Sequence, residues 1–349
     1  MSEAGVDALI VTPGADLRYL TGYHALPLER LTALIVPTVG DATLVVPQLE
    51  RAAAEVAGVT VPIATWDETD DPFALVRALI PDAATVAVDD HMWAARVFAL
   101  RDSLGAEVVA GGRLVSALRV VKTSEEVAAL RDAGLAIDRV HARMGEWLRV
   151  GRTEREVGAD IARAILDEGH ETVDFVIVGS GPNGASPHHE LSDRVIEAGD
   201  PVVVDIGGTT AAGYCSDSTR NYVAGGEPAA EYREFYAVLL AAQDAQRHHA
   251  GPGVSAESLD AIGRQIIAAA GFGEAFFHRT GHGIGQETHE EPYIVEGNSD
   301  LLQPGMAFSI EPGIYLPGKF GARIEDIVVC TADGIEVLNN TPREYVVLP

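Results

Sequence analysis

Residues 201–220 read PVVVDIGGTTAAGYCSDSTR, two extended runs separated by a glycine-rich loop. Asp205 closes the apolar run of the first segment, and Asp217 lies within the second. If the chain folds back around Ala211, these two aspartates lie directly opposite each other in an antiparallel pair. We therefore expect a β-hairpin that carries two facing carboxylates.

The same construction recurs downstream, where Glu311 ends one apolar strand, Glu325 opens another, and Gly318 lies midway between them in the turn PGKFG. Like charges directly opposite each other on a sheet are destabilising, by about 0.2–1 kcal/mol when exposed and more in apolar surroundings. One interpretation of these residues is that they are four unrelated surface acids in a very acidic chain. Two pairs with the same geometry favour a divalent metal site.

A histidine strengthens this interpretation. His282 stands in the string GHGIG, residues 281–285, whose glycines let backbone or metal approach closely. One imidazole and four carboxylates would complete a site for two divalent metal ions, and oxygen-rich ligands favour Mn²⁺, although Co²⁺, Fe²⁺ or Zn²⁺ would also fit. A dinucleotide-binding motif is the other interpretation of these glycines. We reject it because no amphipathic helix follows in residues 286–292.

The composition limits the class of protein. A length of 349 residues favours two domains, and 52 acidic against 25 basic residues give a formal net charge of −27. Such a charge repels nucleic acid and anionic membrane surfaces, so we expect neither as a partner. The N-terminal MSEAGVD is acidic where a signal peptide is basic and then apolar, and no apolar run is long enough to span a membrane. We therefore expect a cytoplasmic protein.

The hydrophobic pattern changes along the chain. Residues 1–118 alternate short apolar runs, one of them at 59–63, with helical stretches, which predicts an α/β domain. Residues 119–349 begin with two capping-box signatures, Thr123 with Glu126 and Thr153 with Glu156, and we expect the first of these helices to continue through Leu148. Strands and glycine-rich turns dominate beyond them, which predicts an α+β domain with helices packed on a curved, mainly antiparallel sheet.

The strings around the five candidate ligands resemble those of the pita-bread metallopeptidases, a group that contains methionine aminopeptidases, Xaa-Pro aminopeptidases and Xaa-Pro dipeptidases (prolidases). These strings are VDIGG, SDSTR, GHGIG, IEPGIY and RIED. DLRYLTG at residues 16–22 and SGPNGASPHH at residues 180–189 are similar to the proline-specific branch in particular. The resemblance covers nearly the whole chain and implies a creatinase-like N-terminal domain followed by a pita-bread catalytic domain.

The resemblance also implies a role for each ligand. Asp205 would bind the first metal, His282 and Glu311 the second, and Asp217 and Glu325 would bridge both. A water held between the two metals would become hydroxide and attack the scissile carbonyl. Glu311 would also be the proton shuttle.

Other residues are implied to act on the substrate. His188 resembles a substrate-contacting histidine, and His289 resembles the one that stabilises the tetrahedral intermediate. Arg323 and His278 would be residues behind the ligands or on the substrate side. The alternative for His188 and its neighbour His189 is that they cap the following turn, and we expect His189 to be an ordinary polar residue.

These features favour a metal-dependent exopeptidase that cleaves the Xaa-Pro bond of short peptides, most readily of dipeptides. An Xaa-Pro aminopeptidase acting on longer peptides is the first alternative, and a catalytically silent peptide-binding member of the fold is a weaker one. The metal-free amidinohydrolases that resemble creatinase have lost the metal ligands, so the five intact candidate ligands of this chain, four acids and one histidine, argue against them.

A dipeptidase needs a cation that holds the free carboxylate just beyond the proline. Dimeric members of the group place the N-terminal domain of one subunit over the site of the other, which makes Arg18 and Arg30 candidates in an expected homodimer. Either arginine could equally be part of a surface salt bridge.

Overall fold

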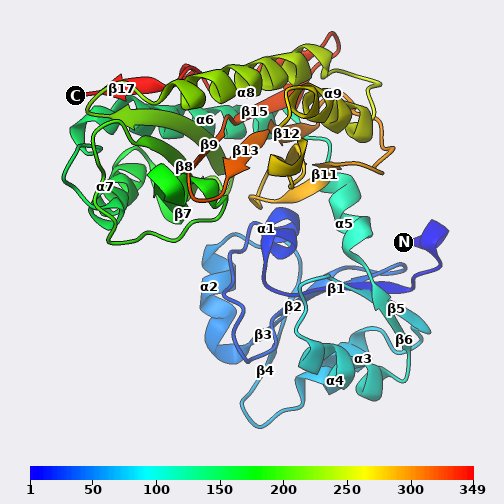
Figure 1. The fold of residues 1–349 in the computed structure, drawn as a ribbon. Helices are drawn as coiled ribbons and strands as arrows, with labels where there is room; N and C mark the ends of the chain where they lie inside the picture. The colour runs from blue at the N-terminus through cyan, green and yellow to red at the C-terminus, as the bar shows by residue number, and fades with distance from the viewer. The chain divides into compact units, whose positions relative to one another are not determined.

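The computed structural model describes all residues, 1–349, and divides into two compact units, Met1–Leu118 and Arg119–Pro349. Figure 1 shows the chain from its N-terminus in blue to its C-terminus in red. None of the helices combines the length and the apolar character that crossing a bilayer requires.

The first unit is built on one six-stranded sheet with the strand order β4-β3-β2-β1-β5-β6. The β1–β2 and β2–β3 pairs are antiparallel, and the β1–β5, β3–β4 and β5–β6 pairs are parallel. The strands are β1 Ala8–Val11, β2 Ala33–Pro37, β3 Thr43–Pro47, β4 Ile63–Trp66, β5 Thr85–Val88 and β6 Glu107–Ala110.

Both faces of this sheet are covered. In β1, Ala8 and Ile10 join one hydrophobic cluster while Leu9 and Val11 join another, because successive side chains of a strand point to opposite faces. The helices are α1 Ala15–Thr21, α2 Arg51–Val56, α3 Pro72–Leu79, α4 Ala94–Leu104 and α5 Gly112–Arg119, with short 3-10 turns at Ser2–Ala4 and Gln48–Glu50. The α/β prediction for this part of the chain is thereby confirmed.

One expected strand is displaced. The apolar run at 59–63 predicted a strand, whereas β4 begins only at Ile63. Pro62 has no N–H to donate to a ladder, and its carbonyl accepts a hydrogen bond from Leu44 N just before the regular β3–β4 pairing starts. Val59 and Val61 are partly buried against the core without belonging to the sheet.

The second unit contains three small sheets, of which only the β17–β9 pair is parallel. Their strand orders are β17-β9-β8-β7, β11-β10-β12-β15-β16 and β13-β14. This agrees with the predicted, mainly antiparallel architecture. The strands are β7 His170–Ser180, β8 Pro201–Thr210, β9 Cys215–Ala224, β10 Gly281–Gly283, β11 Glu290–Ile294, β12 Ala307–Ile310, β13 Gly313–Leu316, β14 Phe320–Arg323, β15 Asp326–Cys330, β16 Ile335–Val337 and β17 Val346–Leu348.

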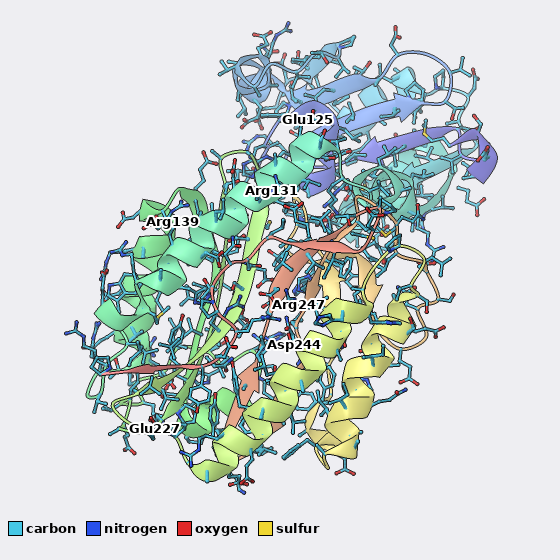
Figure 2. All side chains as sticks on the ribbon, turned by 90° about the horizontal axis from the view of Figure 1, so that it is seen from above. Glu125, Arg131, Arg139, Glu227, Asp244 and Arg247 are labelled. Carbon is cyan, nitrogen blue, oxygen red and sulfur yellow. The ribbon has the colours of Figure 1, made fainter.

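Four helices pack on these strands, and both expected capping boxes are present, at Thr123 and Thr153. The helices are α6 Ser124–Ala142, α7 Glu154–Asp167, α8 Ala230–His249 and α9 Ala256–Ala269, with 3-10 turns at Met144–Glu146, Gly181–Ala185 and Gly273–Ala275. Figure 2 shows α6, labelled at Glu125, Arg131 and Arg139, and α8, labelled at Asp244 and Arg247, over the same side of the strands.

The first of these helices is shorter than predicted. We expected it to continue through Leu148, but α6 ends at Ala142 and a 3-10 turn follows. Gly145 lies in this turn, where a glycine weakens an α-helix by about 1 kcal/mol. Met144 and Leu148 nevertheless remain in the hydrophobic core, so the apolar stripe that produced the prediction is real although the helix is not continuous.

The alternation of β8 decides where a site can form. Val202, Val204 and Ile206 belong to the hydrophobic cluster that includes α6 and α7. Asp205 therefore points to the opposite face of the sheet, away from these helices. One face of the strand builds the core, and the other presents a carboxylate.

Candidate metal centre

The first carboxylate hairpin differs in register from our expectation. In the β8–β9 ladder Asp205 lies opposite Thr219 and Asp217 lies opposite Gly207, so the predicted direct pairing of the two aspartates is wrong. The loop between the strands is centred on Ala212 rather than Ala211.

The reason lies in the turn chemistry. Thr210 N donates to the carbonyl of Tyr214 at 3.0 Å, which leaves a loop of three residues, 211–213. The last of them, Gly213, has a φ of 86°, the left-handed conformation that such loops require. A pairing shifted by two positions leaves the face unchanged, because side chains alternate with a period of two. Asp205 and Asp217 therefore still share one face, as diagonal neighbours.

The second hairpin has the register we expected. Gly313 pairs with Arg323 and Ile310 pairs with Asp326, so a continuous count places Glu311 opposite Glu325. Both glutamates fall in the break between the β12–β15 and the β13–β14 ladders.

The four carboxylates of the two hairpins lie close to His282, which β10 supplies, and to His289. In three groups, the ligand atoms lie within 4.8 Å of one another. These groups are Asp205 with Asp217 and Glu325, His282 with Glu311 and Glu325, and Asp217 with His282 and His289.

The electrostatics of this cluster call for a cation. Burial, together with repulsion from Glu325 and Asp205, raises the pKa of Asp217 well above its usual range. Burial and repulsion from Glu311 do the same for Glu325, one of whose carboxylate oxygens is buried without a hydrogen-bond partner. Buried carboxylates that repel one another and leave an oxygen unpaired are suited to divalent metal ions.

His282 is oriented for such a role. Its Nδ1 lies 3.1 Å from the carbonyl oxygen of Gly283, while Nε2 points into the cluster, 3.1 Å from Glu311 Oε1. Donation from Nδ1 leaves Nε2 available as a ligand. The flanking glycine is needed for space, because a Cβ on Gly281 would lie 2.0 Å from the carbonyl oxygen of Ser309.

Arg323 lies behind the carboxylates. Its guanidinium forms a short ion pair with Asp205 and also donates to the hydroxyls of Thr219, at 3.0 Å, and Tyr315, at 2.9 Å. The Thr219 hydroxyl lies 2.9 Å from Asp205 Oδ1 and 2.8 Å from Glu325 Oε2. Thr219 and Tyr315 were not among the residues predicted, although they lie within the strings SDSTR and IEPGIY.

Two histidines beside the cluster are neutral at pH 7. Burial is the largest cause that lowers the pKa of His278 to about 4, and burial followed by repulsion from His282 lowers the pKa of His289 to about 4. His278 Nδ1 donates to the carbonyl of Arg279 at 2.7 Å, which leaves Nε2 to accept from the Tyr315 hydroxyl at 3.0 Å. The rings of His282 and His289 are in edge contact, with centroids 4.0 Å apart.

The cluster opens into a cleft with two arms. One arm, of about 500 Å³, has an apolar wall at Pro187 and Phe277 and a cationic group at Arg279. The other, of about 660 Å³, is bordered by Phe175 and Leu191. His188, His282, His289, Glu311 and Arg323 line both arms.

Arg279 is a cleft residue that sequence reasoning missed. Its guanidinium lies 4.4 Å from the centroid of the Tyr293 ring, a cation–π contact that holds the charge in place. The two arginines that the sequence analysis proposed for the substrate carboxylate, Arg18 and Arg30, belong to the first unit. Arg18 lies in α1, and Arg30 forms exposed ion pairs of 2.6 Å with Glu29 and Glu68.

The sequence and fold of this chain match those of known proteins. Residues 1–121 match the creatinase/prolidase N-terminal domain, and residues 128–332 match metallopeptidase family M24. The chain is 52% identical to the probable dipeptidase PepE of Mycobacterium tuberculosis, over 100% of this chain and 94% of that protein. It is 35% identical to an Xaa-Pro dipeptidase of Lactobacillus helveticus, over 100% and 97% of the two chains.

The likeness extends to three dimensions. The crystal structure of dipeptidase PepE from Mycobacterium ulcerans superposes with a TM-score of 0.93 at 52% identity, covering 100% of this chain and 95% of that one. The resemblance in the ligand strings and the predicted pita-bread architecture are thus confirmed, and the chain belongs to metallopeptidase family M24.

Proposed function

We propose that this protein is a metal-dependent dipeptidase that hydrolyses the bond between Xaa and Pro in Xaa-Pro dipeptides. The observation that carries the proposal is the buried cluster of four carboxylates and one imidazole, which lies at the base of a cleft and whose charges require cations. Its relatives support the substrate class, because one is named a probable dipeptidase and another an Xaa-Pro dipeptidase.

We assign the ligands as the resemblance to the pita-bread metallopeptidases implies. Asp205 would hold one metal, His282 and Glu311 the other, and Asp217 and Glu325 would contact both, with Mn²⁺ the favoured ion and Co²⁺, Zn²⁺ or Fe²⁺ the alternatives. Two divalent ions in such a site supply an acidified water as nucleophile and polarise the scissile carbonyl.

The protein's own groups then complete the chemistry. Glu311 would accept the proton that the attacking water releases and pass it to the proline nitrogen as that nitrogen leaves. His289, neutral at pH 7, would donate a hydrogen bond to the oxygen on which negative charge develops. His188, which lines both arms of the cleft, would contact the peptide, and His278 would keep Tyr315 and through it Arg323 in place.

The choice of a dipeptide over a longer peptide rests on Arg279. A guanidinium can bind a carboxylate through two parallel hydrogen bonds, and this one lines the same arm as the exposed ring of Phe277, which would pack against the proline ring. Arg279 therefore supplies, within one chain, the cation that a dipeptidase needs. Arg18 and Arg30 remain proposals for the same task in a homodimer.

We also propose a cytoplasmic homodimer. Cys215 and Cys330 are both free and buried, which suits a reducing compartment. A groove of about 240 Å³ in the first unit, bordered by the exposed Leu26 and Leu28 and by Arg30, offers an apolar surface for a second copy. Analytical ultracentrifugation tests the assembly, and mixing Arg30→Ala with inactive Glu325→Gln tests whether activity depends on an arginine supplied in trans.

The test of the activity compares initial rates on Ala-Pro and on a tripeptide that begins with Ala-Pro, each with Mn²⁺ and with a chelator. Cleavage of the dipeptide alone, lost with the chelator, would support the proposal. Cleavage of the tripeptide would indicate an Xaa-Pro aminopeptidase, and cleavage of neither would favour a catalytically silent binding protein. In a dipeptidase that uses Arg279, Arg279→Met should raise KM for Ala-Pro more than Arg279→Lys does.

A further inference from the structure

The segment 186–194, which carries His188 into the cleft, has no regular secondary structure. Its far end is tied to the start of α7, because Arg155 N donates to the carbonyl of Ser192 at 3.0 Å and Glu154 N donates to the carbonyl of Arg194 at 3.1 Å. The part that faces the cleft lies between these bonds and the 3-10 turn before it.

The carboxylate of Glu154 accepts hydrogen bonds from several side chains of this region. Glu154, the first residue of α7, is fully buried, and its Oε1 accepts from Ser180 N and Ser180 Oγ, both at 2.7 Å. Its Oε2 accepts from His189 Nε2 at 2.7 Å and from Ser192 Oγ at 2.5 Å. The amide of Asn183 lies 3.1 Å from both oxygens.

Glu154 has an ion pair with His189 but none with a lysine or arginine. The guanidinium of Arg194 donates to Ser180 Oγ at 2.6 Å and is paired with Asp200. Burial alone would raise the pKa of Glu154, but hydrogen bonds from Ser192 and Ser180 outweigh it and lower that pKa. The group is therefore an anion whose charge is met by aligned donors from four places in the chain.

The hydrogen bonds to Glu154 affect the direction of the neighbouring His188 side chain. His189 and Ser192 are both drawn inward to Glu154, while His188 lies exposed along both arms of the cleft. Arg323 adds a bond of 3.3 Å to the carbonyl of Pro187, on the other side of His188. His188 thus stands between two anchored neighbours.

We propose that Glu154 is a positioning residue, which holds His188 toward the substrate by fixing His189 and Ser192 and never touches the substrate itself. The inference rests on the proposed function, because the contact of His188 with the peptide is part of it. It assigns to His189 a task that the sequence did not suggest.

The test uses variants of His189, which lies at the edge of the network and can be changed with little risk to the fold. His189→Leu removes the donor to Glu154, whereas His189→Gln keeps an N–H at the position of Nε2. With saturating Mn²⁺ we expect KM for Ala-Pro to rise about tenfold in His189→Leu, with kcat and metal content unchanged, and to return most of the way in His189→Gln. Glu154→Gln should raise KM as well, and the matched control Glu156→Gln, on the exposed side of the same helix turn, should not.

Two further measurements separate positioning from simple support of the fold. Because His189 acts through His188, His189→Leu should add nothing to the KM of His188→Ala. Hydrogen exchange of the amides in 186–192 should be faster in His189→Leu and Glu154→Gln than in wild type, and unchanged in Glu156→Gln.

A lower melting temperature of His189→Leu with an unchanged KM, or KM effects of His188 and His189 that multiply, would overturn the positioning role. Failure of the wild type to cleave Ala-Pro would overturn the proposed function instead. The two failures are distinguishable because the hydrogen-exchange experiment does not depend on turnover. Exchange in His189→Leu that is no faster than in wild type would contradict the positioning role, whatever the enzyme hydrolyses.

Discussion

Thr219 stands directly opposite Asp205 in the β8–β9 ladder, and its hydroxyl lies 2.9 Å from Asp205 Oδ1. The same hydroxyl lies 2.8 Å from Glu325 Oε2 and accepts a hydrogen bond from Arg323 at 3.0 Å, so one small side chain links both carboxylate hairpins. A hydroxyl has a single proton and can donate to only one carboxylate at a time. The hydroxyl therefore lies in reach of two proposed metal ligands from different parts of the chain and can orient either of them.

We expect Thr219→Val, which has the same shape without the hydroxyl, to weaken Mn²⁺ binding about tenfold to a hundredfold, because groups that orient metal ligands typically contribute that much. Isothermal titration of the chelated protein with Mn²⁺ measures the effect. Thr219→Ser keeps the hydroxyl and should bind nearly as the wild type does. Equal affinity of the valine variant would show that the carboxylates need no such support.

Asp217→Asn should have opposite effects on stability and on metal binding. The substitution removes one of several buried charges that repel one another, so the chelated variant should melt at a higher temperature than the chelated wild type. It should also lose both bound metal, by elemental analysis, and turnover. Full activity in metal-defined buffer, for this variant or for Glu325→Gln, would contradict the two-metal assignment.

His289→Ala should lower kcat for Ala-Pro by about a hundredfold to a thousandfold, the usual cost of removing one donor to a developing oxyanion. Its metal content should stay at the wild-type value, because the five proposed ligands remain. Elemental analysis alongside steady-state kinetics separates the two effects. Loss of metal from this variant would instead make His289 a ligand.

His141 predicts a pH dependence of stability away from the cleft. Its ring is buried between Tyr222 and the carbonyl of Ser218, and burial, with repulsion from Arg220, lowers its pKa to about 3. In the unfolded chain the His141 ring takes up a proton near pH 6.5, whereas in the folded chain it stays neutral until the pH is near 3. The contribution of His141 to the free energy of unfolding therefore falls as the pH drops from about 6.5 toward 3, by up to about 1.4 kcal/mol per pH unit.

The check is urea unfolding of wild type and His141→Gln between pH 7 and pH 4.5. The glutamine cannot titrate, so its unfolding free energy should fall less over this range, whatever its value at pH 7. Parallel pH profiles for the two proteins would show that His141 is protonated in the native state.

The elements that were predicted well depend on residues close together in sequence. The two capping boxes are formed by residues three apart, and the turn at Gly318 gave the correct register for Glu311 and Glu325. The first hairpin shows the limit of this reasoning. Its loop could be centred on either of two alanines, and only the left-handed conformation of Gly213 decided which.

The sequence by itself therefore determined the type and order of the candidate ligands, because five metal-binding residues in apolar strands and short glycine-rich turns are a local chemical pattern. The tertiary structure alone decided what surrounds them. Glu154 collects donors from residues up to 38 positions away, and Arg323 reaches Asp205 across 118 positions. Such contacts depend on how whole strands and helices pack, and no local spacing of residues specifies them.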